Sequence, residues 1–156
     1  STGAKAVLRA GQIQRMSAGT GIFHSEYNAS QTEPVHFLQI WIEPDAQGIP
    51  PRFEDLSFAP QDSANRWRLV ASPDGRHNSS VIQQHALVWI AHLDAGSPPL
   101  AYVPAEGRHL WLQVATGQVQ VNGNPLEAGD GAALHGGESL WVHAQTPSAM
   151  MLFDLP

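Results

Sequence analysis

The sequence predicts an all-β fold. Short runs of alternating apolar and polar residues recur about every ten residues, and no stretch shows a helical period. Glycine and proline are frequent, with 14 and 12 residues, whereas only 14% of the residues are charged. Many turns and few charge-studded helices are typical of such a composition. Strands of this spacing form a β-sandwich or a small β-barrel.

The predicted strands follow one another along the whole chain. Residues 6–8 and 13–16 form the first two, divided by the turn at Ala10-Gly11, and residues 35–42 form the strongest. The Pro- and Gly-punctuated residues 43–51 are the best candidate linker. Residues 121–124 (Val-Asn-Gly-Asn) predict a tight hairpin turn. The remaining predicted strands are 67–71, 80–84, 86–93, 110–115, 118–121, 131–134, 139–144 and 149–154.

An internal repeat favours a duplicated barrel. Residues 10–19 can be laid over residues 128–137, and in both copies one glycine opens the segment and another closes it eight residues later. Under this offset His24 falls on Val142, and Glu26 falls on Ala144. One barrel would therefore have polar metal ligands at two positions where the other barrel has apolar side chains.

Composition excludes several classes of function. The formal net charge is −6 and the eight basic residues are scattered, which argues against a nucleic-acid surface. The chain has no cysteine, so disulfides, zinc fingers, iron–sulfur clusters and thiol catalysis are excluded. No apolar run approaches membrane-spanning length, and no phosphate-binding loop or nucleophile elbow occurs. We expect a cytoplasmic protein.

His24 and Glu26 are the candidate chemical centre. Two residues apart on a strand, their side chains would share one face, with Ser25 on the other. A neutral imidazole and a carboxylate suit Fe(II), manganese, nickel or zinc. Glu26 could also act as the base for a substrate hydroxyl. His36 could supply a third ligand, although strand histidines more often bond to the backbone.

At this point the residues resemble a known family. Residues 9–26, which contain His24-Ser25-Glu26, resemble the signature of the pirin-like bicupins. Residues 35–42 followed by Pro44, residues 68–75 and the ending 152–156 fit the same family. The resemblance implies a bicupin, with two antiparallel β-barrels or jelly rolls, the first incomplete in this chain. Residues 1–43 would be the C-terminal part of the metal-binding cupin, 44–51 the linker, and 52–156 a second cupin without a metal site.

The resemblance also implies the site. The first cupin of this family binds one metal ion, usually iron, through a His-x-His pair on an early strand plus the His and Glu of His-Ser-Glu. His24 and Glu26 would be the last two ligands, Glu26 also catalytic. Fe(II) is the expected metal, with nickel, manganese, copper and zinc as alternatives. We also expect a substrate pocket formed by Met16, Phe23, His36, Gln39 and Trp41.

This sequence departs from the family pattern in one respect. It contains no His-x-His. We expect the missing ligands upstream of Ser1, or on another chain, so that a complementary N-terminal fragment or a second copy completes the first barrel. The 156-residue chain by itself would then be inactive.

Two functions remain open. The first is a metal-dependent dioxygenase of the quercetin 2,3-dioxygenase type, acting on a flavonol-like small molecule. The second is a non-enzymatic, metal-dependent regulator that binds a protein partner, which an acidic chain favours over direct contact with nucleic acid. No membrane is expected as a partner.

Overall fold

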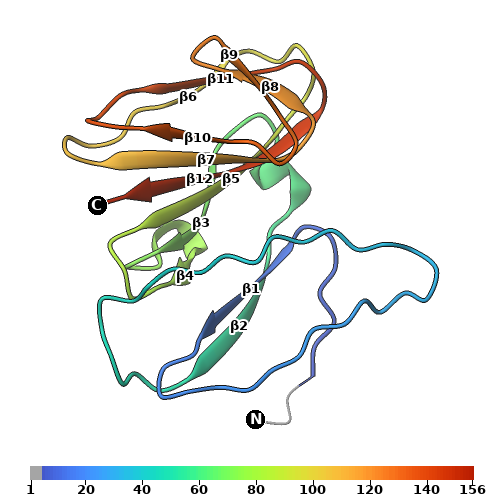
Figure 1. Cartoon of the computed structure of the whole chain (residues 1–156), viewed down its shortest axis with the longest axis vertical. Coiled ribbons are helices and arrows are strands. Elements are labelled where there is room, and N and C mark those ends of the chain that lie inside the picture. The colour runs from blue at the N-terminus through green and yellow to red at the C-terminus, as the bar shows by residue number, and fades with distance from the viewer. Residues whose placement is uncertain (1–4) are drawn as a thin grey trace. The chain divides into compact units, whose positions relative to one another are not determined.

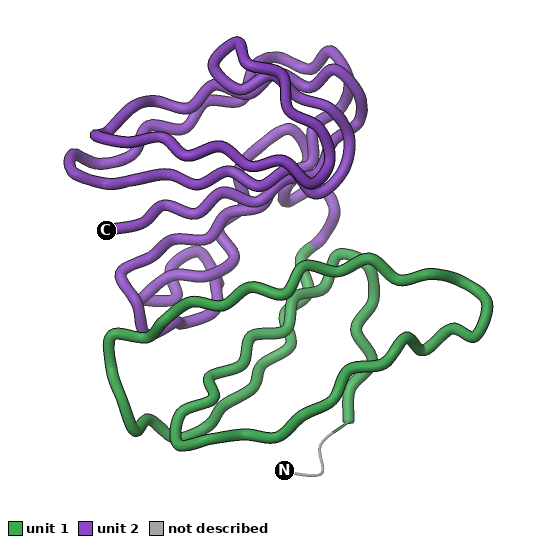
Figure 2. Tube along the Cα trace, viewed as in Figure 1, with its two compact units in different colours: residues 1–58 green, residues 59–156 purple. Residues whose placement is uncertain are grey.

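The computed structural model describes residues 5–156, and the predicted all-β class is confirmed: 41% of the chain is strand and 4% helical. The chain forms two compact units, residues 1–58 and residues 59–156 (Figure 2). Among residues 5–156, no helix has the length and apolar character needed to cross a membrane.

Unit 1 contains one antiparallel ladder. Strand β1 (Gln12–Ser17) pairs with β2 (Arg52–Ser57) from Gln12 opposite Ser57 to Ser17 opposite Arg52 (Figure 1). Cross-strand side chains support this register, because the Gln12 amide donates to the Ser57 hydroxyl at 2.8 Å. The predicted strand 13–16 is thereby confirmed, whereas β2 was not predicted.

A long connection, residues 18–51, joins the two strands of unit 1 without regular structure. Gly19 adopts φ +54°, and a Cβ there would lie 2.0 Å from the carbonyl oxygen of Ile49, so only glycine fits. The predicted strands 6–8 and 35–42 are wrong, since both segments are irregular. A strand needs a neighbour that takes its backbone hydrogen bonds, and no described residue pairs with residues 35–42.

Unit 2 contains two sheets (Figure 1). The six-stranded sheet has the order β10-β7-β12-β5-β3-β4, and the four-stranded sheet has the order β6-β11-β8-β9. The strands of the larger sheet are β3 (Arg68–Ser72), β4 (Ser80–Val81), β5 (Leu87–Leu93), β7 (His109–Thr116), β10 (Gly131–Leu134) and β12 (Ser148–Leu155). Those of the smaller sheet are β6 (Leu100–Tyr102), β8 (Gln118–Val121), β9 (Asn124–Glu127) and β11 (Leu140–Ala144). Two short 3-10 turns, Pro60–Asp62 and Arg76–Asn78, complete the unit.

Most of these strands agree with the sequence pattern. β3, β5, β7, β8, β10, β11 and β12 confirm predicted strands within one or two residues at most ends. The predicted strand 80–84 shrinks to the two residues of β4, and β6 and β9 were missed. β9 contains Pro125 and lies at the sheet edge, where a residue without an N–H is tolerated.

The hairpin turn between β8 and β9 is confirmed. Val121 pairs with Asn124, and the two residues between them have positive φ, 48° at Asn122 and 85° at Gly123. Positive φ at both positions belongs to the type I′ turn that Asn-Gly favours. The Asn122 side chain also accepts from the Trp141 backbone N–H at 2.8 Å, which ties the turn to β11.

The core of unit 2 lies between its sheets. Along β12 every second residue from Ser148 to Asp154 is buried, which is the two-residue period of a strand with one covered face. Leu112, Val142 and Leu152 are fully buried in the same apolar cluster. Burial of each such side chain contributes about 1.5–3 kcal/mol. These apolar contacts hold the two sheets of unit 2 together.

The division into units differs from the predicted linker at 44–51. The boundary between the two units falls in the chain between Phe58 and Ala59, because β2 belongs to the same unit as β1, the strand with which it pairs. Proline and glycine residues indicate where the chain turns, whereas the boundary of a compact unit depends on which strands pair with each other. The assignment of residues 52–156 to one cupin therefore stays a prediction.

Candidate functional site

His24 and Glu26 approach each other in unit 1. The Nε2 atom of His24 lies 3.9 Å from Oε1 of Glu26, and the two side chains are 40% and 45% exposed. The segment that carries them is not part of a ladder, yet the spacing of two residues still brings both side chains together, as an extended segment would. Both side chains are therefore partly accessible to a ligand from solvent.

The chemistry of this pair fits a divalent transition metal. Bonds from such a metal to imidazole nitrogen or carboxylate oxygen are about 2.0–2.2 Å long. Two donors of one tetrahedral ion are then about 3.4 Å apart, and two neighbouring donors of an octahedral ion about 3.0 Å. The observed 3.9 Å needs only a small side-chain rotation to reach either value. His24 and Glu26 can therefore hold one side of a metal ion.

The described chain does not supply the rest of a ligand set. Across residues 5–156, no group of three or more His, Cys, Asp or Glu side chains could hold a metal ion. His36 is exposed and belongs to no such group. Two ligands leave most of the coordination sphere of a metal to water or to other donors.

The predicted substrate-pocket residues lie in different surroundings. Met16 is half-buried in β1, opposite Phe53 of β2. Phe23 and Trp41 are 87% and 89% exposed. His36 and Gln39 are also exposed and belong to the irregular segment 18–51. The substrate pocket stays a prediction, since four of its five residues are exposed to solvent in the described part of the chain.

The second copy of the repeat has apolar residues at the ligand positions. Val142 and Ala144 are both buried in the core of unit 2. Between them, His143 is exposed on the opposite face of β11. His135 instead pairs with His109, with their Nδ1 atoms 3.3 Å apart on the exposed side. In unit 2, buried apolar side chains therefore occupy the positions that correspond to His24 and Glu26.

Sequence reasoning missed a buried polar network in unit 2. Asp154 is 2% exposed, and its carboxylate accepts a hydrogen bond of 2.5 Å from the Tyr102 hydroxyl and another from Arg108 Nε. Burial raises the pKa of the Tyr102 phenol, and the hydrogen bond to Asp154 raises it further. The signal was a carboxylate at an inward position of an apolar strand, which demands partners from elsewhere.

A strand-rich chain with cupin-type sheets and a His-x-Glu pair belongs to the cupin class. Comparison with known proteins then narrows the class. A family model described as "Quercetinase C-terminal cupin domain" matches residues 69–155, and the Pirin family model matches residues 1–42. The chain belongs to the pirin family, as its resemblance predicted.

Individual relatives agree with this family. The chain is 41% identical over 156 residues to a quercetin 2,3-dioxygenase of Escherichia coli K12, covering 100% of this chain and 66% of the relative. It is 38% identical to a putative quercetin 2,3-dioxygenase of Pseudomonas aeruginosa, covering 99% of this chain and 66% of that protein. The chain thus spans just under two thirds of these relatives.

Solved structures resemble the fold closely. The crystal structure of YhhW from Escherichia coli superimposes with a TM-score of 0.91 at 40% identity, covering 100% of this chain and 65% of that one. A second structure, bacterial pirin YhhW in complex with nickel(II), gives a TM-score of 0.90 at 40% identity, over 99% of this chain and 66% of that one. The bicupin prediction, with a partial first cupin in this chain, is confirmed.

Proposed function

We propose that this chain carries two ligands of the metal centre of a dioxygenase that opens the ring of a flavonol. The observation that carries the proposal is the His24–Glu26 pair, 3.9 Å apart, inside the segment that matches the Pirin family. The nickel(II) complex of one relative and the names of the others support a divalent metal and a flavonol substrate. Fe(II) is our first choice of metal, with nickel, manganese, copper and zinc as alternatives.

The remaining ligands would come from outside these 156 residues. The described residues offer no third ligand, and the relatives are about half as long again as this chain. A segment that corresponds to the remaining third of the relatives, or a second copy, would complete both the first barrel and the site. Residues 1–43 would then belong to the metal-binding cupin, 44–51 to the linker and 52–156 to the second cupin, in a cytoplasmic protein.

The residues of this chain would have separable roles. When bound, the metal would supply a Lewis acid and a centre for oxygen chemistry. His24 would hold its imidazole nitrogen toward the ion. Glu26 would accept the proton of a flavonol hydroxyl at its free carboxylate oxygen. Phe23 and Trp41 would contact the flat rings of the substrate once a further segment covers them.

Loss of flavonol absorbance under oxygen tests this function. The protein extended to the length of its relatives and loaded with Fe(II) should consume quercetin, and the His24→Ala/Glu26→Ala double variant should not. A matched control is the Glu33→Ala/His143→Ala double variant, since both side chains are exposed and lie away from the pair in sequence. Equal rates for the wild type and the His24/Glu26 variant would refute the enzymatic proposal.

The quercetin assay combined with a metal-binding measurement distinguishes the alternative function. A protein that binds the metal through His24 and Glu26 but leaves quercetin intact would be the metal-dependent regulator instead. Its aromatic side chains at Phe23 and Trp41 would then contact a protein partner.

A further inference from the structure

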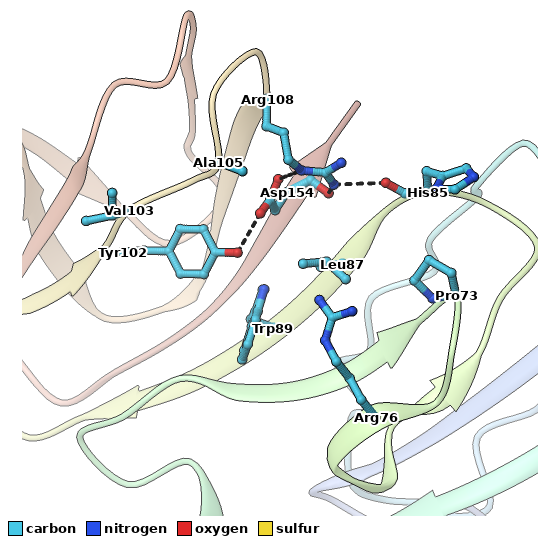
Figure 3. A pocket seen from close by; sticks show the side chains of 10 residues that line it. All are labelled: Pro73, Arg76, His85, Leu87, Trp89, Tyr102, Val103, Ala105, Arg108 and Asp154. Atoms are coloured by element: carbon cyan, nitrogen blue, oxygen red, sulfur yellow. Dashed lines mark hydrogen bonds and ion pairs between the residues drawn. The ribbon is translucent and has the colours of Figure 1, made fainter.

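Unit 2 contains a pocket of about 380 Å³ that none of the candidate metal or substrate residues lines (Figure 3). Its walls come from strands β5, β6 and β12 and from the loops that precede β4, β5 and β7. The volume lies at the small end of the range for small-molecule sites. Its occupant would therefore be a molecule of about one ring.

The acidic group of the pocket is already occupied. One carboxylate oxygen of Asp154 accepts the Tyr102 hydroxyl at 2.5 Å, and the other contacts Arg108 Nε. Arg108 is held further by its Nη2 atom, which donates to the backbone carbonyls of His85 at 2.8 Å and Asp154 at 2.7 Å. Both oxygens of this carboxylate already accept a hydrogen bond from the protein.

Arg76 contributes hydrogen-bond donors to the pocket. Arg76 is 44% exposed, and its Nη1 atom lies 3.2 Å from Asp74 Oδ2. Its Nε and Nη2 atoms make no hydrogen bond with any residue that the structure describes. Figure 3 shows the Arg76 guanidinium directed toward Leu87 and Trp89, into the pocket. A ligand with acceptor oxygens would use these free N–H groups.

The rest of the wall is apolar and aromatic. Leu87 and Trp89 share the inward face of β5 with the buried residues of β12 that they pair with, Asp154 and Leu152. The Trp89 ring packs edge-to-face against Tyr102, with centroids 5.6 Å apart and planes at 65°. This rigid aromatic pair offers a flat surface to a ring and costs little side-chain entropy on binding.

We propose that this pocket binds a small aromatic carboxylate. The carboxylate lies on the guanidinium of Arg76, whose planar fork matches two carboxylate oxygens, and the ring lies against Trp89 and Leu87. The inference does not depend on the proposed metal centre, because every residue it uses belongs to unit 2.

Indole ¹H–¹⁵N spectra of the full chain test this proposal with benzoate as the probe. The Trp89 signal, assigned with the Trp89→Phe variant, should shift saturably as benzoate is added. Arg76→Gln should weaken binding about tenfold, the typical loss of a charge-assisted hydrogen bond. Arg76→Lys should give an intermediate affinity, because it keeps the charge without the fork. Arg66→Gln is the matched control and should leave the affinity unchanged, since Arg66 is exposed outside the pocket.

Three results would overturn the proposal. The first is an Arg76→Gln variant that is folded, as judged by the other indole signals, and binds benzoate as tightly as the wild type does. The second is a shift of equal size with benzyl alcohol, which has the ring without the carboxylate. Absence of any Trp89 shift at millimolar benzoate would also refute it.

Discussion

At the scale of single residues, Glu26 would have two tasks, as a metal ligand and as a base. Glu26→Gln separates them, because the amide keeps a neutral oxygen ligand but accepts no proton. We expect the extended protein with this change to lose at least about 100-fold in flavonol turnover. Its metal affinity should fall by a smaller factor. Parallel absorbance and equilibrium-dialysis measurements compare the two losses, with Glu33→Gln as the control. Unchanged turnover in Glu26→Gln would contradict the role of Glu26 as the base.

Tyr102 makes the stability of unit 2 depend on alkaline pH. Burial, and then the hydrogen bond to Asp154, raise the pKa of its phenol above the ordinary value of 10.0. Above about pH 10 the unfolded chain loses this proton while the folded chain keeps it, so the free energy of unfolding falls as pH rises. Denaturant titrations between pH 8 and 11 should show this decline in the wild type and a weaker one in Tyr102→Phe. Parallel pH profiles in the two proteins would contradict it.

Local residue patterns predicted only part of what the structure brings together. His24 and Glu26 were proposed as a pair because residues two apart in an extended chain lie on the same side, and the structure places their side chains 3.9 Å apart. The network of Asp154, Tyr102 and Arg108 was not found, because its members are distant in sequence and meet only through the pairing of strands. Local spacing carries no information about such contacts.

At the scale of elements, alternation of apolar residues predicted the strands of unit 2 better than those of unit 1. In unit 2 each pattern meets a partner, as β12 does between β5 and β7. Residues 35–42 have the same pattern, but no described segment pairs with them. Alternation reports which face a segment can bury, whereas a strand also requires a neighbour for its backbone groups.

Among the glycines of unit 2, Gly117 leaves the least room for a side chain. It joins β7 to β8, one from each sheet, with φ +84°, and a Cβ would lie 2.2 Å from Ser148 Oγ and 2.4 Å from the carbonyl oxygen of Pro147. Gly117→Ala should therefore cost about 3 kcal/mol or more in the free energy of unfolding, from left-handed strain plus the clash. Denaturant unfolding followed by tryptophan fluorescence measures this loss.

Gly123→Ala is the matched control for that measurement. Gly123 has nearly the same φ, +85°, but a Cβ there meets no atom within 4 Å. It should cost only about 1 kcal/mol, from left-handed strain alone. Equal losses at Gly117 and Gly123 would mean that the close approach to Ser148 does not constrain the turn.

At the scale of the whole molecule, unit 1 exposes several aromatic side chains. Phe23, Tyr27 and Trp41 are each almost fully exposed, unlike the tryptophans of unit 2. We expect the 156-residue chain alone to self-associate in sedimentation experiments, because exposed aromatic side chains promote association between molecules. Phe23→Ser/Trp41→Ser should reduce self-association, whereas Trp141→Ser should not. A monomeric wild-type chain at high concentration would contradict this expectation.

We propose that His24 and Glu26 form one part of a metal centre whose other ligands would lie outside these 156 residues. Equilibrium dialysis against nickel(II) tests it most directly, on the chain alone and on the protein extended to the length of its relatives. We predict weak binding by the chain, binding at least about 100-fold tighter by the extended protein, and loss of the tight site in His24→Ala/Glu26→Ala. Equal affinity of the two wild-type proteins, or tight binding that survives the double substitution, would contradict it.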